Sequence, residues 1–475
     1  MKGQLSKTKI LATIGPATSS AIDLEKIINA GASALRLNFS HGSFEDFEKL
    51  FEVINDICIK KSLPIPILVD LQGPKIRIGE LKEPQYEIKK GETIEITNEV
   101  IVGTKDKVST SYKELINDAN IGNIILVDDG LLKFEVIEKK KKSLVCKIIE
   151  GGILKPRKGM NLPGMKLSTP SITEKDLINL EFAIKHRVDF IALSFVREAK
   201  DIKDLKNWLK KRGKDIPVIA KIEKEEAVHN FDSILEAADG IMVARGDLGV
   251  ELAPQMVPIL QKNIIKNCNA VGKVVITATQ MLESMISNPI PTRAEASDVA
   301  NAVLDGTDVV MLSGETSVGK HPDVTVKIMN DILARTELQT DLRKPIEYCV
   351  PLTLQENLMD AIGQGVANTS KQLQAAAIVV FTHFGKKARL ISKFRPECPV
   401  FAFTNSFDKM NQLNLFYGIK PFFYDGMDEE EEAIKFATKV LKKGKLVKKG
   451  DLLIFTGGVP NYINGRRHWL QFSVL

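Results

Sequence analysis

Short apolar runs rich in β-branched residues recur along the chain, and an amphipathic helical segment follows each of them. Eight such runs precede position 340, at residues 9–14, 34–39, 67–71, 190–195, 218–222, 241–244, 274–277 and 309–312. Eight buried parallel strands that alternate with helices are what a (β/α)8 barrel requires. The pattern therefore predicts an α/β protein built on a TIM barrel, with helix N-caps at Ser43 and Thr173.

The spacing breaks once, between the third and fourth runs, which lie about 120 positions apart. In the sequence between them, apolar and polar residues alternate in short segments that are separated by glycine turns. These segments are 86–88, 93–97, 124–127, 132–137 and 143–149. This alternation predicts an antiparallel β-barrel domain, residues 74–165, inserted as a lid between hinges at Gly73-Pro74 and Pro163-Gly164. The lysine run 139–142 could be a basic patch, but its place between two strands favours a solvated hairpin turn.

Beyond the polar stretch 341–345, helices and strands alternate again, with strand-like runs at 377–381, 400–403 and 452–455. The predicted division is a barrel of residues 1–73 and 166–340, the lid, and a C-terminal α/β regulatory domain of residues 341–475.

Composition narrows the functional classes. A net charge of +6, with 27% charged residues, is too mild and dispersed for a nucleic-acid binder. The five cysteines are scattered and never spaced as CxxC, which favours reduced thiols and excludes a zinc knuckle. No signal peptide and no apolar run of membrane-spanning length is visible. We expect a cytoplasmic protein with neither nucleic-acid nor membrane partners.

Polar residues stand at nearly every predicted strand end, where barrel enzymes place their reactive groups. They include Arg36, Asn38, Ser40, His41, Asp70, Lys221, Glu223, Arg245, Asp247, Thr279 and Glu315. Lys221 and Glu223 are two apart on one strand, so their side chains share a face. Alone, that pair could be a structural ion pair. Glu223 with Asp247 on the next strand is more telling, because two carboxylates with open positions suit Mg²⁺.

Several long motifs resemble those of the pyruvate kinase family, in the right order from Thr8 to the C-terminus. They are Asn-Phe-Ser-His-Gly at 38–42, Gly-Ile-Met-Val-Ala-Arg-Gly-Asp-Leu-Gly at 240–249, Ala-Thr-Gln-Met-Leu-Glu-Ser-Met at 278–285, and the stretches 291–295 and 311–316. The resemblance implies phosphoryl transfer from phosphoenolpyruvate to ADP, a lid that closes over the site, and a homotetramer.

The resemblance also implies roles for individual residues. Arg36 would bind the phosphoryl group, Lys221 would stabilise the transition state, and Thr279 would join the relay that protonates the enolate. Glu223 and Asp247 would hold Mg²⁺, for which Mn²⁺ can substitute, and amides around Gly246 and Asp247 would take the substrate carboxylate. Nucleotide contacts would come from Asn38, His41, Arg77 and Lys175. Other interpretations stay open: His41 could cap a helix, Arg197 could be an ion-pair partner or a ligand contact, and Thr279 by itself could be a turn residue.

Two departures from the family pattern bear on regulation and ions. Many relatives read Asp-Thr-Lys-Gly-Pro-Glu after the third strand, whereas this chain has the bacterial-type variant Asp-Leu-Gln-Gly-Pro-Lys at 70–75. Leu71 offers no side-chain oxygen to potassium. We therefore expect K⁺ not to be required, with the pocket of Asn38, Ser40 and Asp70 served by Lys75.

The second departure lies in the C-terminal domain, where Phe384 and Lys387 replace the hydroxyl residues expected of a sugar-phosphate effector loop. A phosphorylated effector could still bind near Thr382, Lys386, Lys387, Arg466 and Arg467, although a solvated basic surface explains these residues nearly as well. Two rival functions remain at this stage: a magnesium-dependent lyase or aldolase acting on pyruvate enolates, and a non-catalytic paralogue.

Overall fold

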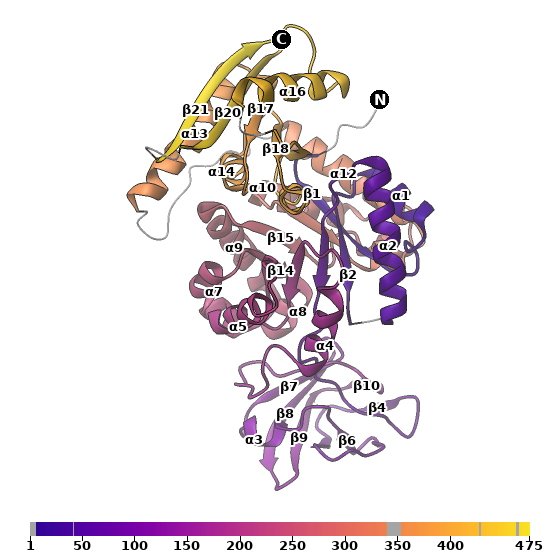
Figure 1. Cartoon of the computed structure of the whole chain (residues 1–475). Helices are drawn as coiled ribbons and strands as arrows, with labels where there is room; N and C mark the ends of the chain where they lie inside the picture. The colour runs from indigo at the N-terminus through magenta and orange to yellow at the C-terminus, as the bar shows by residue number, and fades with distance from the viewer. Residues whose placement is uncertain (1–5, 41, 340–352, 427–428, 462–464) are drawn as a thin grey trace.

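The computed structural model describes residues 6–40, 42–339, 353–426, 429–461 and 465–475. Figure 1 shows three parts along one axis: a β/α barrel in the middle, a β-rich lid at one end, and an α/β domain at the other.

Eight parallel strands form the closed barrel, in the order β1-β16-β15-β14-β13-β12-β3-β2. Their bounds differ from the predicted ones by at most two residues: β1 (Lys9–Ile14), β2 (Ala34–Asn38), β3 (Ile67–Asp70), β12 (Phe190–Leu193), β13 (Val218–Ile222), β14 (Gly240–Ala244), β15 (Val274–Ala278) and β16 (Val309–Leu312). Nearly all their residues are buried, as expected for parallel strands covered by helices. The predicted barrel is confirmed.

Helices surround these strands: α1 (Ala21–Ala30), α2 (Phe44–Lys61), α4 (Glu174–Ala183), α5 (Ala199–Lys210), α6 (Glu225–His229), α7 (Phe231–Ala237), α8 (Arg245–Glu251), α9 (Val257–Val271), α10 (Arg293–Asp305), α11 (Gly314–Ser317) and α12 (Pro322–Gln339). Ser43 and Thr173 both cap their helices through a complete capping box, which satisfies amides that the first turn leaves free. Both predicted caps are confirmed.

The inserted segment folds around its own apolar core. It contains β4 (Tyr86–Ile88), β5 (Thr93–Thr97), β6 (Lys107–Ser109), α3 (Leu115–Asp118), β7 (Ile124–Val127), β8 (Leu132–Lys139), β9 (Ser143–Glu150), β10 (Gly152–Leu154) and β11 (Met160–Asn161). The lysine run lies in the β8–β9 hairpin, as predicted.

The expectation of an antiparallel lid is wrong where β6 joins the sheet. The six-stranded sheet has the order β11-β7-β8-β9-β5-β6, and β6 pairs parallel to β5. The connecting loop is drawn aside by backbone bonds between Gly103 and residues 80–82, so the chain re-enters the sheet in its original direction.

The C-terminal part comprises α13 (Leu354–Gln372), β17 (Ala377–Phe381), α14 (Lys386–Lys393), β18 (Val400–Thr404), α15 (Phe407–Leu413), β19 (Ile419–Phe423), α16 (Glu430–Lys443), β20 (Leu452–Asn461) and β21 (Gly465–Val474). Its sheet meets the amino ends of the barrel strands, where Lys9 Nζ donates to the Ile419 carbonyl at 2.7 Å and Arg395 pairs with Asp308 at 2.7 Å. The carboxyl ends therefore face the lid (Figure 1). In the parts of the chain described here, no helix has the length and apolarity needed to cross a membrane.

Candidate active site

Four charged side chains meet at the carboxyl ends of β2, β3 and β13. Lys221 Nζ lies 2.8 Å from Glu223 Oε1 and 3.3 Å from Asp70 Oδ1. Arg36 holds the other oxygen of Asp70, with Nε at 2.8 Å and Nη2 at 2.7 Å. The β2–β3 register places Arg36 beside Asp70, since Arg36 pairs with Leu68 and Asn38 with Asp70, and β13 lies beyond β3 with only β12 between them. Two cations and two carboxylates thus share one site with little access to water.

Burial and charge act against each other in this cluster. Burial by itself would lower the pKa of Lys221, but the carboxylates of Asp70 and Glu223 outweigh it and raise that pKa. For Asp70, burial opposes ionisation, yet Lys221 and Arg36 bring its pKa below the usual value. Lys221 is therefore a fixed positive charge and Asp70 a fixed negative one at neutral pH.

For Glu223, burial and the neighbouring charges shift the pKa in the opposite direction to that of Asp70. Burial raises its pKa, the negative charge of Asp247 raises it further, and Lys221 only partly compensates. The Phe195 amide donates to Glu223 Oε2 at 2.8 Å, and the Phe195 backbone is left-handed (φ 54°). Two repelling carboxylates with free lone pairs are a donor set that fits a hard divalent cation. In the described residues no cluster of three or more His, Cys, Asp or Glu side chains could hold a metal, so water and substrate would complete such a site.

Thr279 lies directly after β15 in the left-handed region (φ 66°) and faces the start of α8. Its hydroxyl accepts a hydrogen bond from the Gly246 amide at 2.8 Å and donates to the Ala278 carbonyl at 2.6 Å. Arg245 fixes this segment, because its Nη2 donates to the Thr279 carbonyl at 2.6 Å while Nη1 forms a bidentate pair with Asp298. The hydroxyl is thus held in one orientation.

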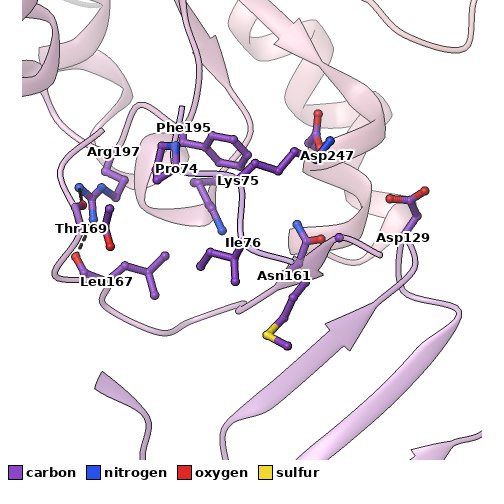
Figure 2. A pocket seen from close by; sticks show the side chains of 13 residues that line it. Pro74, Lys75, Ile76, Asp129, Asn161, Leu167, Thr169, Phe195, Arg197 and Asp247 are labelled. Atoms are coloured by element: carbon purple, nitrogen blue, oxygen red, sulfur yellow. Dashed lines mark hydrogen bonds between the residues drawn. The ribbon is translucent and has the colours of Figure 1, made fainter. Parts of the chain in front are cut away.

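A cavity separates this site from the lid (Figure 2). Its barrel side carries Phe195 and Asp247, and its lid side carries Asn161, Asp129 and Ile76. Both hinge segments contribute, through Pro74 and Lys75 on the way in and Leu167 and Thr169 on the way out. A substrate in it would be covered by lid and barrel together.

Comparisons with known proteins agree with this geometry. The family model "Pyruvate kinase, barrel domain" matches residues 5–326, and "Pyruvate kinase, alpha/beta domain" matches residues 360–469. The chain belongs to the pyruvate kinase family. It is accordingly a phosphotransferase of glycolysis, which transfers the phosphoryl group of phosphoenolpyruvate to ADP and releases pyruvate and ATP.

Individual pyruvate kinases are similar over almost the whole chain. The protein of Staphylococcus epidermidis is 43% identical over 473 residues, which is 99% of this chain and 81% of that protein. The protein of Staphylococcus aureus is 42% identical with the same coverage. A crystal structure of a pyruvate kinase from Cryptosporidium parvum superposes with a TM-score of 0.91 at 36% identity, covering 99% of this chain and 96% of the other.

The residues expected at the nucleotide make hydrogen bonds outside the Lys221 cluster. Arg77 Nη1 donates to the Arg157 carbonyl at 3.0 Å, and Lys175 Nζ donates to Gln72 Oε1 at 2.9 Å. Asn38 accepts from the Ser40 amide at 3.2 Å. His41 lies outside the described residues. Among the described residues, no hydrogen bond or ion pair joins Arg77 or Lys175 to the Lys221 cluster.

The expected cation pocket is only partly assembled. Asp70 is present, but its oxygens are engaged by Arg36, Lys221 and Ser194. Lys75 has an exposed side chain that lines the cavity shared with Asp247, and none of its described contacts reaches Asn38, Ser40 or Asp70. Whether Lys75 serves this pocket stays a prediction.

The residues expected at the effector site differ in how exposed their side chains are. Lys386 is exposed, whereas Lys387 is 6% exposed and donates to the Gly457 carbonyl of β20. Burial lowers the pKa of Lys387 to about 8. The Thr382 side chain is buried as well. Arg466 and Arg467 lie on β21, and their side chains fall outside the described residues.

Two supporting residues, Ser194 and Thr13, were not singled out in the sequence analysis. Ser194, which follows β12, accepts from Lys221 Nζ at 2.6 Å and donates to Asp70 Oδ1 at 3.4 Å. Thr13 on β1 accepts from Arg36 Nη1 at 3.0 Å. Both stand at strand ends, so the rule that selected Lys221 could have found them. Arg197 donates to the Leu167 and Thr169 carbonyls, both at 2.6 Å, and so anchors the exit hinge rather than pairing with a carboxylate.

Proposed function

We propose that Lys221 is the main positive charge that stabilises the transition state of phosphoryl transfer. The observation that supports this proposal is the buried contact of Lys221 with Asp70 and Glu223. Charge spreads over the phosphoryl oxygens in a loose transition state. A preorganised ammonium stabilises that charge without reorganising. Arg36, steadied by Asp70 and Thr13, would bind the same group and orient it.

Glu223 and Asp247 are the residues that would hold Mg²⁺, the cofactor in general use in the family. When bound, the ion neutralises and orients substrate oxygens. Glu223 is kept in position by the Phe195 amide and by Lys221, and Asp247 by its place in the first turn of α8. We expect Mn²⁺ to support the reaction as well, because it accepts the same oxygen ligands.

Thr279 would belong to the relay that delivers a proton to the enolate carbon. Its hydroxyl proton is directed to the Ala278 carbonyl, so a proton would reach the substrate only through a chain that includes water. The Gly246 amide now bonded to Thr279 would turn to the substrate carboxylate. Asn38, His41, Arg77 and Lys175 are proposed nucleotide contacts.

The metal assignment is tested by titrating Mg²⁺ calorimetrically into the unaltered chain and into Glu223→Gln. The amide keeps the shape of the side chain but removes its charge, so we expect affinity and turnover to fall together. Wild-type Mg²⁺ affinity in Glu223→Gln would refute the assignment.

K⁺ is proposed to be dispensable. Relatives that need the ion place an oxygen where this chain has Leu71, whose side chain is 1% exposed in an apolar setting. Asp70 is already neutralised by Arg36 and Lys221, which reduces its need for a further cation. Lys75 would add its positive charge from the hinge.

Further proposals rest on the family alone or on exposed charge. They are a homotetramer, a cytoplasmic location, the domain limits 1–73 with 166–340, 74–165 and 341–475, and a phosphorylated effector in the C-terminal domain. Of the four basic residues expected at that site (Lys386, Lys387, Arg466 and Arg467), Lys386 is the one whose side chain is described as exposed.

A further inference from the structure

Glu251 is a buried carboxylate for which the reaction has no evident use. It ends α8, one helical turn after Asp247. Its Oε1 lies 2.6 Å from Lys224 Nζ, and both side chains are almost completely buried. Lys224 in turn directly follows Glu223. One buried ion pair therefore joins the two elements that carry the proposed magnesium ligands.

The lid reaches the same carboxylate oxygen. Asn161 Nδ2 donates to Glu251 Oε1 at 3.0 Å. Asn161 belongs to β11, which pairs with β7 and so with the main sheet of the lid. Figure 2 shows Asn161 on the lid side of the cavity and Asp247 on the barrel side. The lid also approaches α8 at Gly130, where a Cβ, if one were added, would lie 3.8 Å from Val250.

Lys224 extends this link toward Glu223. Its ammonium lies 5.8 Å from the centre of the Phe195 ring, and the Phe195 amide is the donor to Glu223 Oε2. A buried ion pair that loses one partner leaves an uncompensated charge, so Lys224 and Glu251 must stay together. These contacts connect Asn161 to α8 on one side and, through Lys224, to Phe195 and Glu223 on the other.

We propose that Glu251 is a positioning residue that ties the seating of the lid, through Asn161, to the alignment of Glu223 and Asp247, through Lys224 and α8. The proposal rests on the assignment of Mg²⁺ to those two carboxylates. It predicts that Asn161 of the lid affects metal affinity although its side chain bonds to Glu251 and not to Glu223 or Asp247.

The test measures Mn²⁺ binding by electron paramagnetic resonance and amide hydrogen exchange across β7 and β11, in the full chain without substrate. Asn161→Ala removes only the lid's bond to Glu251. We expect it to weaken Mn²⁺ binding about tenfold, the scale seen when a partner of a metal ligand is removed, and to speed exchange in both strands. Glu251→Gln, which leaves Lys224 unpaired, should weaken binding at least as much.

Matched controls separate this effect from general damage. Asn98→Ala removes an amide bond to the Lys113 carbonyl, 3.0 Å long and wholly within the lid, and should leave Mn²⁺ binding unchanged. Glu223→Gln should abolish most binding. If Glu223→Gln binds Mn²⁺ normally, the metal assignment fails and takes this inference with it.

If Glu223→Gln loses Mn²⁺ while Asn161→Ala binds within twofold of the unaltered chain, the metal assignment stands and the role of Glu251 is overturned. Should Glu251→Gln fail to fold, Asn161→Ala decides alone, because Asn161 is only half-buried.

Discussion

Replacing Lys221 by alanine should damage stability and catalysis for separable reasons. The ammonium is 2.8 Å from Glu223, 3.3 Å from Asp70 and 2.6 Å from Ser194. Without it, Asp70 keeps Arg36, but Glu223 keeps only the Phe195 amide and still faces Asp247. Breaking a buried pair in this way costs about 3–5 kcal/mol in the free energy of unfolding.

The pH dependence of that cost follows from Glu223. Its pKa is already raised in the folded protein, so folding favours the protonated form, and stability falls as pH rises through the folded pKa. Removing Lys221 raises this pKa further. Lys221→Ala should therefore lose less stability near pH 5 than near pH 8, in urea unfolding followed by circular dichroism.

Catalysis should fall further than stability explains. Loss of a preorganised charge at the transition state costs about 10²–10³ in turnover. The assay is pyruvate formation at saturating substrates, at a temperature where the variant is fully folded. As a control, Lys61→Ala breaks the partly exposed pair with Glu25 and should cost at most about 1 kcal/mol with normal turnover. Turnover of Lys221→Ala near that of the unaltered chain would refute the assigned role.

Three further predictions concern other parts of the molecule. Thr279→Val should slow proton exchange at pyruvate C3 while phosphoenolpyruvate affinity stays nearly intact; lost affinity with normal exchange would contradict the relay. The initial rate should not depend on K⁺ when a large inert cation replaces it at constant ionic strength, and Lys75→Glu should depress the rate measured without K⁺; a rise of about tenfold or more on adding K⁺ to the unaltered chain would show that the ion is needed. Because burial lowers the pKa of Lys387 to about 8, the unfolded chain binds one more proton than the folded chain between about pH 8 and 10.5, and the free energy of unfolding should rise across that window. Lys387→Met should flatten this rise in urea titrations and add on the order of 1–3 kcal/mol to the free energy of unfolding at pH 7. An unchanged slope in the variant would show that the lysine is solvated.

The sequence was informative where structure is local. Strand periodicity placed Lys221 and Glu223 on one face, and barrel geometry brought Asp70 and Asp247 to the same end, because both follow from rules that act over a few residues. The capping boxes at Ser43 and Thr173 were readable for the same reason.

Contacts between distant segments were not readable. Lys387 looked like part of a basic surface pair, yet β20, about 70 positions later, buries it. The parallel β5–β6 pair depends on how a loop rests on residues 80–82, which no alternation of residues reveals. The bond from Asn161 to Glu251 joins lid and barrel across 90 positions, and nothing in either segment indicates the other.

The most direct test of the central claim is the rate at which the purified chain makes pyruvate from phosphoenolpyruvate and ADP, coupled to lactate dehydrogenase. We predict steady pyruvate formation that requires Mg²⁺ and stops when the ion is chelated. Pyruvate formation no faster than in the enzyme-free mixture, with Mg²⁺ and both substrates present, would contradict the account and identify the chain as a non-catalytic member of its family.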